Sequence, residues 1–225
     1  MIRVNIVVEG QAEETFVNEV LAQHLAQFNV GAVARRVEFS RKREQIQRGG
    51  LLEYPKLRKD VSNWLKQDRH AFVTTMVDLY ALPGDFPQRE EAAGLARPLE
   101  RVLFLERAFA GDINSRHFIP NIQLHEFEAL LFVRIGGLQP YYPAFASEIA
   151  QLEAATANLN PEEINEGRTT APSKRILNHV PIYDKVIGGS LMVIDLGLPA
   201  IRVRCPHFDQ WVTKLEQLGQ PVVGA

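Results

Sequence analysis

Apolar residues in the first part of the chain alternate between short continuous runs and helical stripes. Residues 3–8 carry a β-branched run that stops at Glu9 and Gly10, which predicts a buried strand followed by a tight turn. Over 13–28, apolar positions recur at three- and four-residue steps, as on one face of a helix. Residues 30–39 alternate loosely, like a second strand. A strand, a helix and a strand in this order favour a parallel sheet.

The same alternation continues along the chain. Helical spacing over 57–65 precedes a strand over 71–77, which ends at Asp78, and a loop containing Pro and Gly follows. Residues 97–110 predict another helix, although Glu106 interrupts its apolar stripe. The residues that we expect to face inward from this helix are Leu99, Val102, Leu103 and Phe109.

A last short strand is predicted over 118–124, just before His125 and Glu126. After residue 140, prolines punctuate short helical patterns and no strand is indicated. We therefore predict an α/β fold: a core of residues 1–135 with a parallel sheet flanked by helices, and a helical C-terminal extension over 136–225, packed on the core.

Composition and charge narrow the class of protein. Of the 225 residues, 46% are hydrophobic and 23% charged, which is typical of a folded globular protein. The net charge of −2 excludes a polycation, so binding to nucleic acid would require separated charges. The single cysteine, Cys205, excludes an internal disulfide. Neither a signal peptide nor a membrane span of ~20 apolar residues is indicated, so we expect a cytoplasmic protein.

Acidic residues follow the predicted strands. Because the carboxyl ends of parallel strands line one crevice, several carboxylates should converge there. Like charges repel unless a cation neutralises them, and the hard cations Mg²⁺ and Mn²⁺ prefer oxygen ligands. The pattern therefore predicts a site for one or two metal ions. Its candidate ligands are Glu9, Glu13, Asp78, Glu126 and Glu128.

Each acidic residue also has a purely structural interpretation. Glu13 is predicted in the first turn of a helix, where a negative charge stabilises the helix dipole by a few tenths to about 1 kcal/mol. Glu9 is harder to explain in this way, because a charge that ends a buried strand is costly unless something pairs with it.

Several segments together resemble the bacterial family of unknown function DUF4276. The run His-Glu-Phe-Glu-Ala-Leu-Leu over 125–131 is the most specific of them. The segments that carry the resemblance are 8–16, 74–87, 118–132, 171–175 and 205–208. The family is similar to Toprim-type proteins, including the nuclease half of overcoming-lysogenization-defect (OLD) enzymes, and its members accompany ATPases in phage-defence gene clusters. The resemblance implies a Toprim-like, metal-dependent nuclease acting on DNA or RNA, with a partner ATPase.

The resemblance also assigns roles to residues. Glu9 matches the first-strand glutamate of Toprim proteins, Glu13 the acid four residues on, and Asp78 the first Asp of their Asp-x-Asp motif. Tyr80 replaces the second Asp, and Glu126 or Glu128 is a candidate to take its place. The late basic residue of the nuclease subgroup corresponds to Lys174 or Lys185.

Basic residues are dense over 35–69, where they are candidates for holding a phosphate backbone or for forming an ordinary solvated face. The segment 171–175 predicts a helix start with Ser173 as its cap; its two cations make it a candidate anion site, and a simple helix cap is the alternative. No phosphate-binding loop of nucleotide triphosphatases is present. Cys205 favours packing over nucleophilic chemistry, and His125 is a candidate metal ligand or acid.

Two functions follow. The first is phosphodiester hydrolysis with Mg²⁺ or Mn²⁺, assisted by a partner ATPase. The second is a non-catalytic interaction or sensor subunit that has lost a metal ligand, as Tyr80 suggests.

Overall fold

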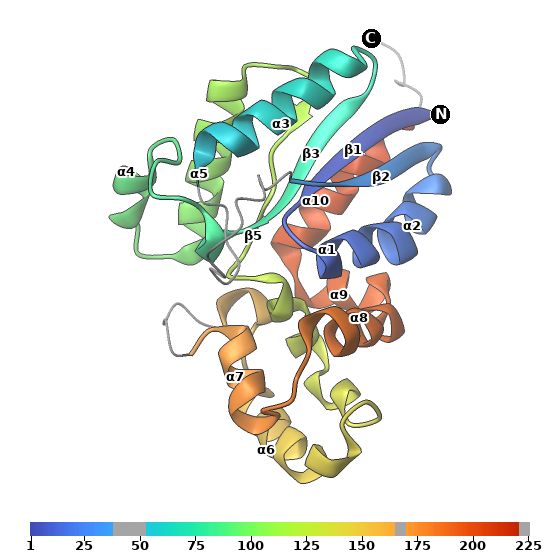
Figure 1. Ribbon diagram of the computed structural model, residues 1–225, viewed down its shortest axis with the longest axis vertical. Coiled ribbons are helices and arrows are strands. Elements are labelled where there is room, and N and C mark those ends of the chain that lie inside the picture. The colour runs from blue at the N-terminus through green and yellow to red at the C-terminus, as the bar shows by residue number, and fades with distance from the viewer. Residues whose placement is uncertain (38–52, 165–169, 221–225) are drawn as a thin grey trace, which may run out of the picture.

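The sheet of the protein is parallel and lies between two layers of helices (Figure 1). The computed structural model describes residues 1–37, 53–164 and 170–220. The strand order is β2-β1-β3-β4, and a short fifth strand continues along β3. The strands are β1 (Ile2–Val8), β2 (Val30–Arg36), β3 (Phe72–Asp78), β4 (Phe118–Ile119) and β5 (Ile122–Gln123).

The chain changes direction across the sheet after β1. It passes first to β2 on one side of β1 and then crosses back to β3 on the other side. The carboxyl ends of β1 and β3 therefore lie at a topological switch point, where open α/β sheets place their ligands. The predicted α/β fold is confirmed.

Two apolar cores cover the two faces of the sheet. On one face, Ile6 packs with Phe16 and Phe208; on the other, Val7 packs with Leu57 and Phe109. Alternation along β1 explains this, because successive side chains of a strand point to opposite faces. The first face is covered by α1 (Gln11–Phe16), a π-helix η1 (Val17–Leu21), α2 (Ala22–Ala26) and α10 (Pro206–Gln217). The second is covered by α3 (Tyr54–Gln67) and α5 (Pro98–Ile113).

After β5, the described residues form helices joined by turns and contain no strand, as predicted. Its longer helices are α6 (Ala146–Thr156), α7 (Pro172–His179), α8 (Ser190–Leu196) and α9 (Leu198–Arg204). A π-helix, η7 (Lys185–Gly189), leads into α8. Short 3₁₀ segments are η3 (Phe127–Val133), η4 (Ile135–Leu138), η5 (Pro143–Phe145) and η6 (Pro161–Glu163). The segments η2 (Leu79–Ala81) and α4 (Arg89–Ala93) contribute Leu79 and Ala92 to the second core.

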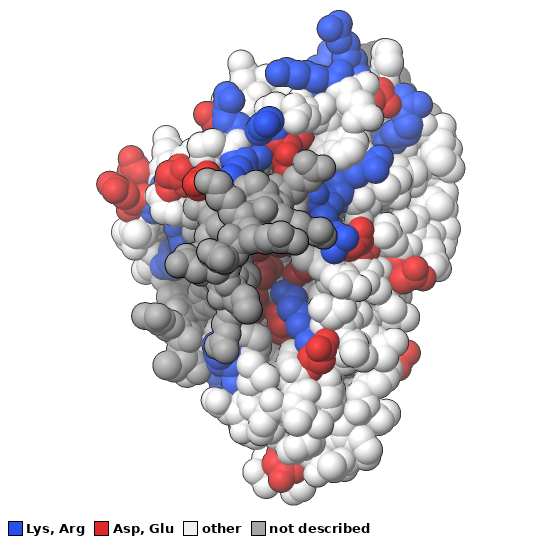
Figure 2. Space-filling model, viewed as in Figure 1, with Lys and Arg blue, Asp and Glu red and all other residues white. Residues whose placement is uncertain are grey.

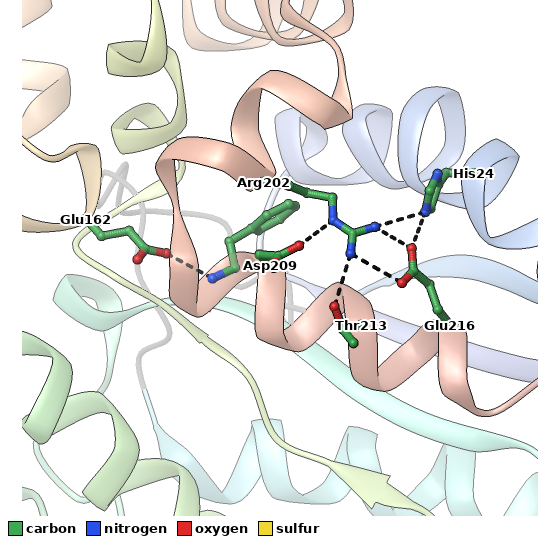
Figure 3. Close-up of polar contacts among 7 residues, drawn as sticks. His24, Glu162, Arg202, Asp209, Thr213 and Glu216 are labelled. Atoms are coloured by element: carbon green, nitrogen blue, oxygen red, sulfur yellow. Dashed lines mark hydrogen bonds and ion pairs between the residues drawn. The ribbon is translucent and has the colours of Figure 1, made fainter.

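Polar contacts fasten the C-terminal helices to the sheet layer. Trp211 of α10 donates its indole N–H to Thr74 Oγ1 of β3 over 2.9 Å, and both side chains are buried. Arg202 of α9 binds Glu216 of α10, which also contacts His24 of α2 (Figure 3). The boundary between core and extension remains a prediction.

Among the described residues, no single helix is both long enough and apolar enough to cross a membrane. The stretches Lys185–Leu196 and Leu198–Arg204 reach that length only when counted together, and they are bent by 86°.

Some predicted elements differ in detail. The helix predicted over 13–28 begins at Gln11 and contains the π-turn η1. The strand predicted over 118–124 is divided into β4 and β5 at Pro120 and Asn121. The second strand ends at Arg36, and residues 38–39 of its predicted range lie outside the described residues.

The inward face of α5 was predicted wrongly in part. Leu99 is 44% exposed, whereas Leu105 and Glu106 are buried. Burial of Glu106 is favourable because its Oε1 accepts the backbone N–H of Ile122 at 2.9 Å and lies 3.0 Å from His207 Nε2. A satisfied glutamate thus occupies a position of the core face.

Candidate active site

The five predicted acidic residues line one cavity of about 430 Å³ at the switch point of the sheet. Glu9 directly follows β1, Glu13 lies in the first turn of α1, and Asp78 is the last residue of β3. Four segments contribute to this cavity, together with Lys185 from η7. The acidic lining residues are Glu9, Glu13, Asp78, Glu126 and Glu128.

Glu9 joins the ends of the two central strands. Its Oε1 accepts the backbone N–H of Asp78 at 2.7 Å. Glu13 is almost completely buried behind it, and a Cβ atom on Gly10 would lie 2.8 Å from Glu13 Oε2. A side chain at position 10 would therefore displace the end of this carboxylate, and glycine leaves room for it beside the backbone.

Glu126 and Glu128 differ in what they bind. Glu126 Oε1 accepts the backbone N–H of Ser173 at 2.6 Å, at the start of α7. The predicted helix start at 171–175 is confirmed, but the Ser173 side chain makes no cap hydrogen bond, so that its predicted capping role is wrong. A carboxylate satisfies this helix end instead, which the helix dipole favours. Glu128 is buried in the first turn of η3 and faces Lys185.

Lys185 lies among the carboxylates. Its Nζ is 2.9 Å from Glu13 Oε1, 3.3 Å from Glu128 Oε2 and 3.8 Å from Asp78 Oδ2. It also lies over the Phe127 ring, 5.6 Å from the centroid. Lys174 is exposed on α7 and is not among the residues that line the cavity.

Burial dominates the electrostatics of the site. It raises the pKa of Glu9 from 4.5 to about 7, against the hydrogen bond from Asp78 and with the help of Glu13. Burial likewise raises the pKa of Glu128 to about 7, although Lys185 opposes the shift. The pKa of Asp78 is raised well above its usual range, chiefly by burial. Burial alone would lower the pKa of Lys185, but Asp78, Glu128 and Glu13 outweigh it and raise this pKa.

Two buried carboxylate oxygens make no hydrogen bond among the described residues: Glu13 Oε2 and Glu128 Oε2, the second of which has the Lys185 ammonium group 3.3 Å away. Desolvated oxygens of this kind are costly unless a cation approaches them. The donor set of Glu9, Glu13, Asp78 and Glu128 consists only of carboxylates, which suit Mg²⁺ or Mn²⁺. In the described ranges, however, no three His, Cys, Asp or Glu side chains already have the arrangement of a metal site.

Other candidates lie near the cavity or in the core. Tyr80, which replaces the second Asp of the motif, lines the cavity and is 38% exposed. His125 is wholly buried and its Nε2 contacts the backbone oxygen of Glu162 at 2.9 Å, away from the cavity lining. Cys205 is buried, and burial raises the pKa of its thiol, which agrees with packing.

Basic side chains gather next to this region. Figure 2 shows Lys and Arg over the part of the molecule that contains β1, β2 and α3 in Figure 1. Arg36, at the end of β2, pairs with Glu14 of α1, and Arg35 lies 4.3 Å above the Trp64 ring. Arg58 is paired with Asp112. Four basic residues of the segment 35–69 lie outside the described residues: Arg41, Lys42, Arg43 and Arg48.

Fold and cavity together define an α/β protein with a carboxylate-rich pocket at the C-terminal edge of its parallel sheet. Residues 8–216 match the family described as Domain of unknown function (DUF4276), and the chain belongs to this family. No curated protein matches the chain.

Two solved structures of the C-terminal region of the Xanthomonas campestris pv. campestris OLD protein are similar to it. The one phased with platinum has a TM-score of 0.41 and 13% identity, over 97% of this chain and 98% of that chain. The one phased with iodine has a TM-score of 0.40 and 15% identity, over 96% and 98%.

Proposed function

We propose that the protein is a metal-dependent nuclease that hydrolyses phosphodiester bonds of nucleic acids, with a Toprim-like use of its sheet. The observation that carries this proposal is the acidic cavity itself. Carboxylates from the end of β1 and from α1, β3 and η3 converge on it; the buried Glu13 Oε2 has no hydrogen-bond partner among the described residues, and Glu128 Oε2 faces the ammonium group of Lys185.

Glu9, Glu13 and Asp78 would hold the Mg²⁺ or Mn²⁺ ion, and Glu128 supplies a fourth carboxylate. Glu126 has one oxygen engaged by Ser173, so only its other oxygen is available. When bound, such an ion lowers the pKa of water and neutralises charge on the phosphate.

Two residues of the cavity suit proton transfer. In the metal-free site, burial raises the pKa of Glu9 and of Glu128 to about 7, so either carboxyl group can take up or release a proton near neutral pH. Whichever of the two does not bind metal accepts the proton of the attacking water.

We assign the late basic role to Lys185 rather than Lys174. Lys185 lines the cavity, and its ammonium group is held among the carboxylates. The positive charge of a lysine that lines the cavity can stabilise the negative charge that develops on the leaving oxygen.

The Lys and Arg side chains over β1, β2 and α3 support a polyanionic substrate, DNA or RNA (Figure 2). Since the sequence has no phosphate-binding loop of its own, we propose that a separate ATPase partner supplies nucleotide hydrolysis, as in a phage-defence effector.

A cleavage assay tests the proposal. Supercoiled plasmid, single-stranded DNA and RNA are incubated with the protein and Mn²⁺, with and without a neighbouring ATPase. Glu9→Gln and Asp78→Asn should abolish cleavage. Glu14→Gln is the matched control, because Glu14 is adjacent to Glu13 but pairs with Arg36 outside the cavity. If neither wild type nor any variant cleaves a polymer in any of these conditions, the nuclease proposal is overturned.

A non-catalytic interaction or sensor subunit is the second candidate. Tyr80 favours it, because a phenol occupies the position where the motif has a metal-binding Asp. Such a subunit would bind its partner without cleavage, and Glu9→Gln would leave its effect in cells unchanged.

A further inference from the structure

The oxygens of the acidic cavity are spaced around an ammonium group. Nζ of Lys185 lies 2.9 to 3.8 Å from one oxygen each of Glu13, Glu128 and Asp78. These distances suit N–H···O contacts, whereas Mg²⁺ requires about 2.0 to 2.1 Å to each oxygen. For an ion at the position of Nζ, these oxygens would have to approach by about 1 to 2 Å.

Lys185 and a divalent ion cannot share this space. Both would bind the carboxylate groups of Glu13 and Glu128, and two cations within a few ångströms of each other repel strongly in a partly desolvated cavity. One of them has to leave before the other can bind.

The side chain of Lys185 can leave without a change in the backbone. It is 36% exposed, and its four-carbon stem has several rotatable bonds. The backbone of η7 has less freedom: a Cβ atom on Gly188 would lie 2.1 Å from the Tyr142 hydroxyl, and one on Gly189 would lie 2.5 Å from the Tyr183 hydroxyl. The η7 turn is thus packed closely at its end while the lysine at its start projects over the cavity.

We propose that Lys185 is an internal counter-ion that occupies the metal position and is displaced by the divalent ion. Metal loading moves its ammonium group away from the carboxylates and toward solvent, from where a substrate phosphate would enter. The inference rests on the proposed function, since it assumes that the cavity binds a divalent ion.

Metal affinity provides the first test. Mn²⁺ is titrated calorimetrically into wild type, Lys185→Met and Lys174→Met. We expect Lys185→Met to bind Mn²⁺ about tenfold or more tightly than wild type, because a competing unit charge is removed from the site. Lys174→Met loses the same charge from an exposed position outside the cavity lining and should bind like wild type. Equal affinities of wild type and Lys185→Met, or weaker binding by Lys185→Met, would overturn the inference.

Amine labelling provides a second test that needs no variant. Wild type is treated with an acylating reagent with and without saturating Mn²⁺, and modification is followed by mass spectrometry. Lys185 should react severalfold faster with the metal, while Lys174 should react equally in both samples. A Lys185 that stays protected in the presence of bound Mn²⁺ contradicts displacement.

The outcomes separate the two proposals. If wild type binds Mn²⁺ tightly and cleaves nucleic acid, but Lys185→Met binds Mn²⁺ with the same affinity, the nuclease proposal stands and the proposed displacement of Lys185 is rejected. No Mn²⁺ binding by wild type or by Lys185→Met would remove the metal site and both proposals with it.

Discussion

Replacing Glu9 with Gln should stabilise the metal-free protein at alkaline pH and have little effect at acidic pH. Glu9 is a partly buried carboxyl group whose pKa is raised to about 7, chiefly by burial. Because the folded protein holds this proton more tightly than the unfolded chain, its favourable contribution is complete below pH 4.5 and is lost as the pH rises through about 7. Gln is never charged, and its carbonyl oxygen can still accept the N–H of Asp78.

The size of the effect follows from the pKa. A rise from 4.5 to about 7 corresponds to roughly 3 kcal/mol at pH 8. Since Glu9 retains some contact with solvent, screening reduces this penalty, and we expect a gain of about 1 to 3 kcal/mol in the free energy of unfolding. For a chain of this length, the midpoint of thermal unfolding should then rise by about 2 to 10 °C.

Urea and thermal unfolding of wild type and Glu9→Gln in EDTA, at pH 5 and pH 8, measure this difference. Glu14→Gln serves as the control, because its side chain pairs with Arg36 near the surface. With excess Mn²⁺ at pH 8 the ranking should reverse, since wild type gains the binding energy of the ion. If Glu9→Gln is no more stable than wild type at pH 8, or gains equally at pH 5, the assignment of a desolvated carboxylate to position 9 is refuted.

Two further substitutions test the packing around the site. Gly188→Ala places a methyl group 2.1 Å from the Tyr142 hydroxyl, so it should displace η7. If Lys185 acts in catalysis, metal-dependent cleavage should fall at least tenfold. Gly84→Ala is the control, because its methyl group meets no atom within 4 Å and cleavage should be unchanged. Full cleavage by Gly188→Ala would contradict the positioning of Lys185 by this turn. Trp211→Phe removes the donor to Thr74 Oγ1 and should lower the free energy of unfolding by about 1 to 3 kcal/mol in urea denaturation; a loss below a few tenths would show that this buried hydrogen bond contributes little.

The central part of the site could be predicted because it depends on local patterns. A β-branched run that ends in an acidic residue marks both the strand and its carboxyl end, and parallel order brings those ends to one edge. Glu9 and Asp78 lie together for this reason. Glu13 follows from the helix that must come after β1.

The other features of the site and fold depend on packing between distant segments, which the periodicity of apolar residues cannot predict. Lys185 reaches the cavity only because η7 packs against Tyr142 and Tyr183, and the sequence left it as one of two alternatives with Lys174. The mistake on α5 has a similar origin. Glu106 faces the core because its partners, the N–H of Ile122 and the ring of His207, come from later segments of the chain.

The acidic cavity can be neutralised in three ways, and the structure contains two of them. Burial raises the pKa of Glu9 and Glu128 to about 7, so protons remove part of the negative charge near neutral pH. Lys185 removes another part through Glu13, Asp78 and Glu128. A divalent ion would replace both, because it binds ionised carboxylates and repels the ammonium group. Protons, lysine and metal therefore compete for the same oxygens, and the chemistry of the site depends on which of them holds Glu9 and Glu128 at the pH of the cell.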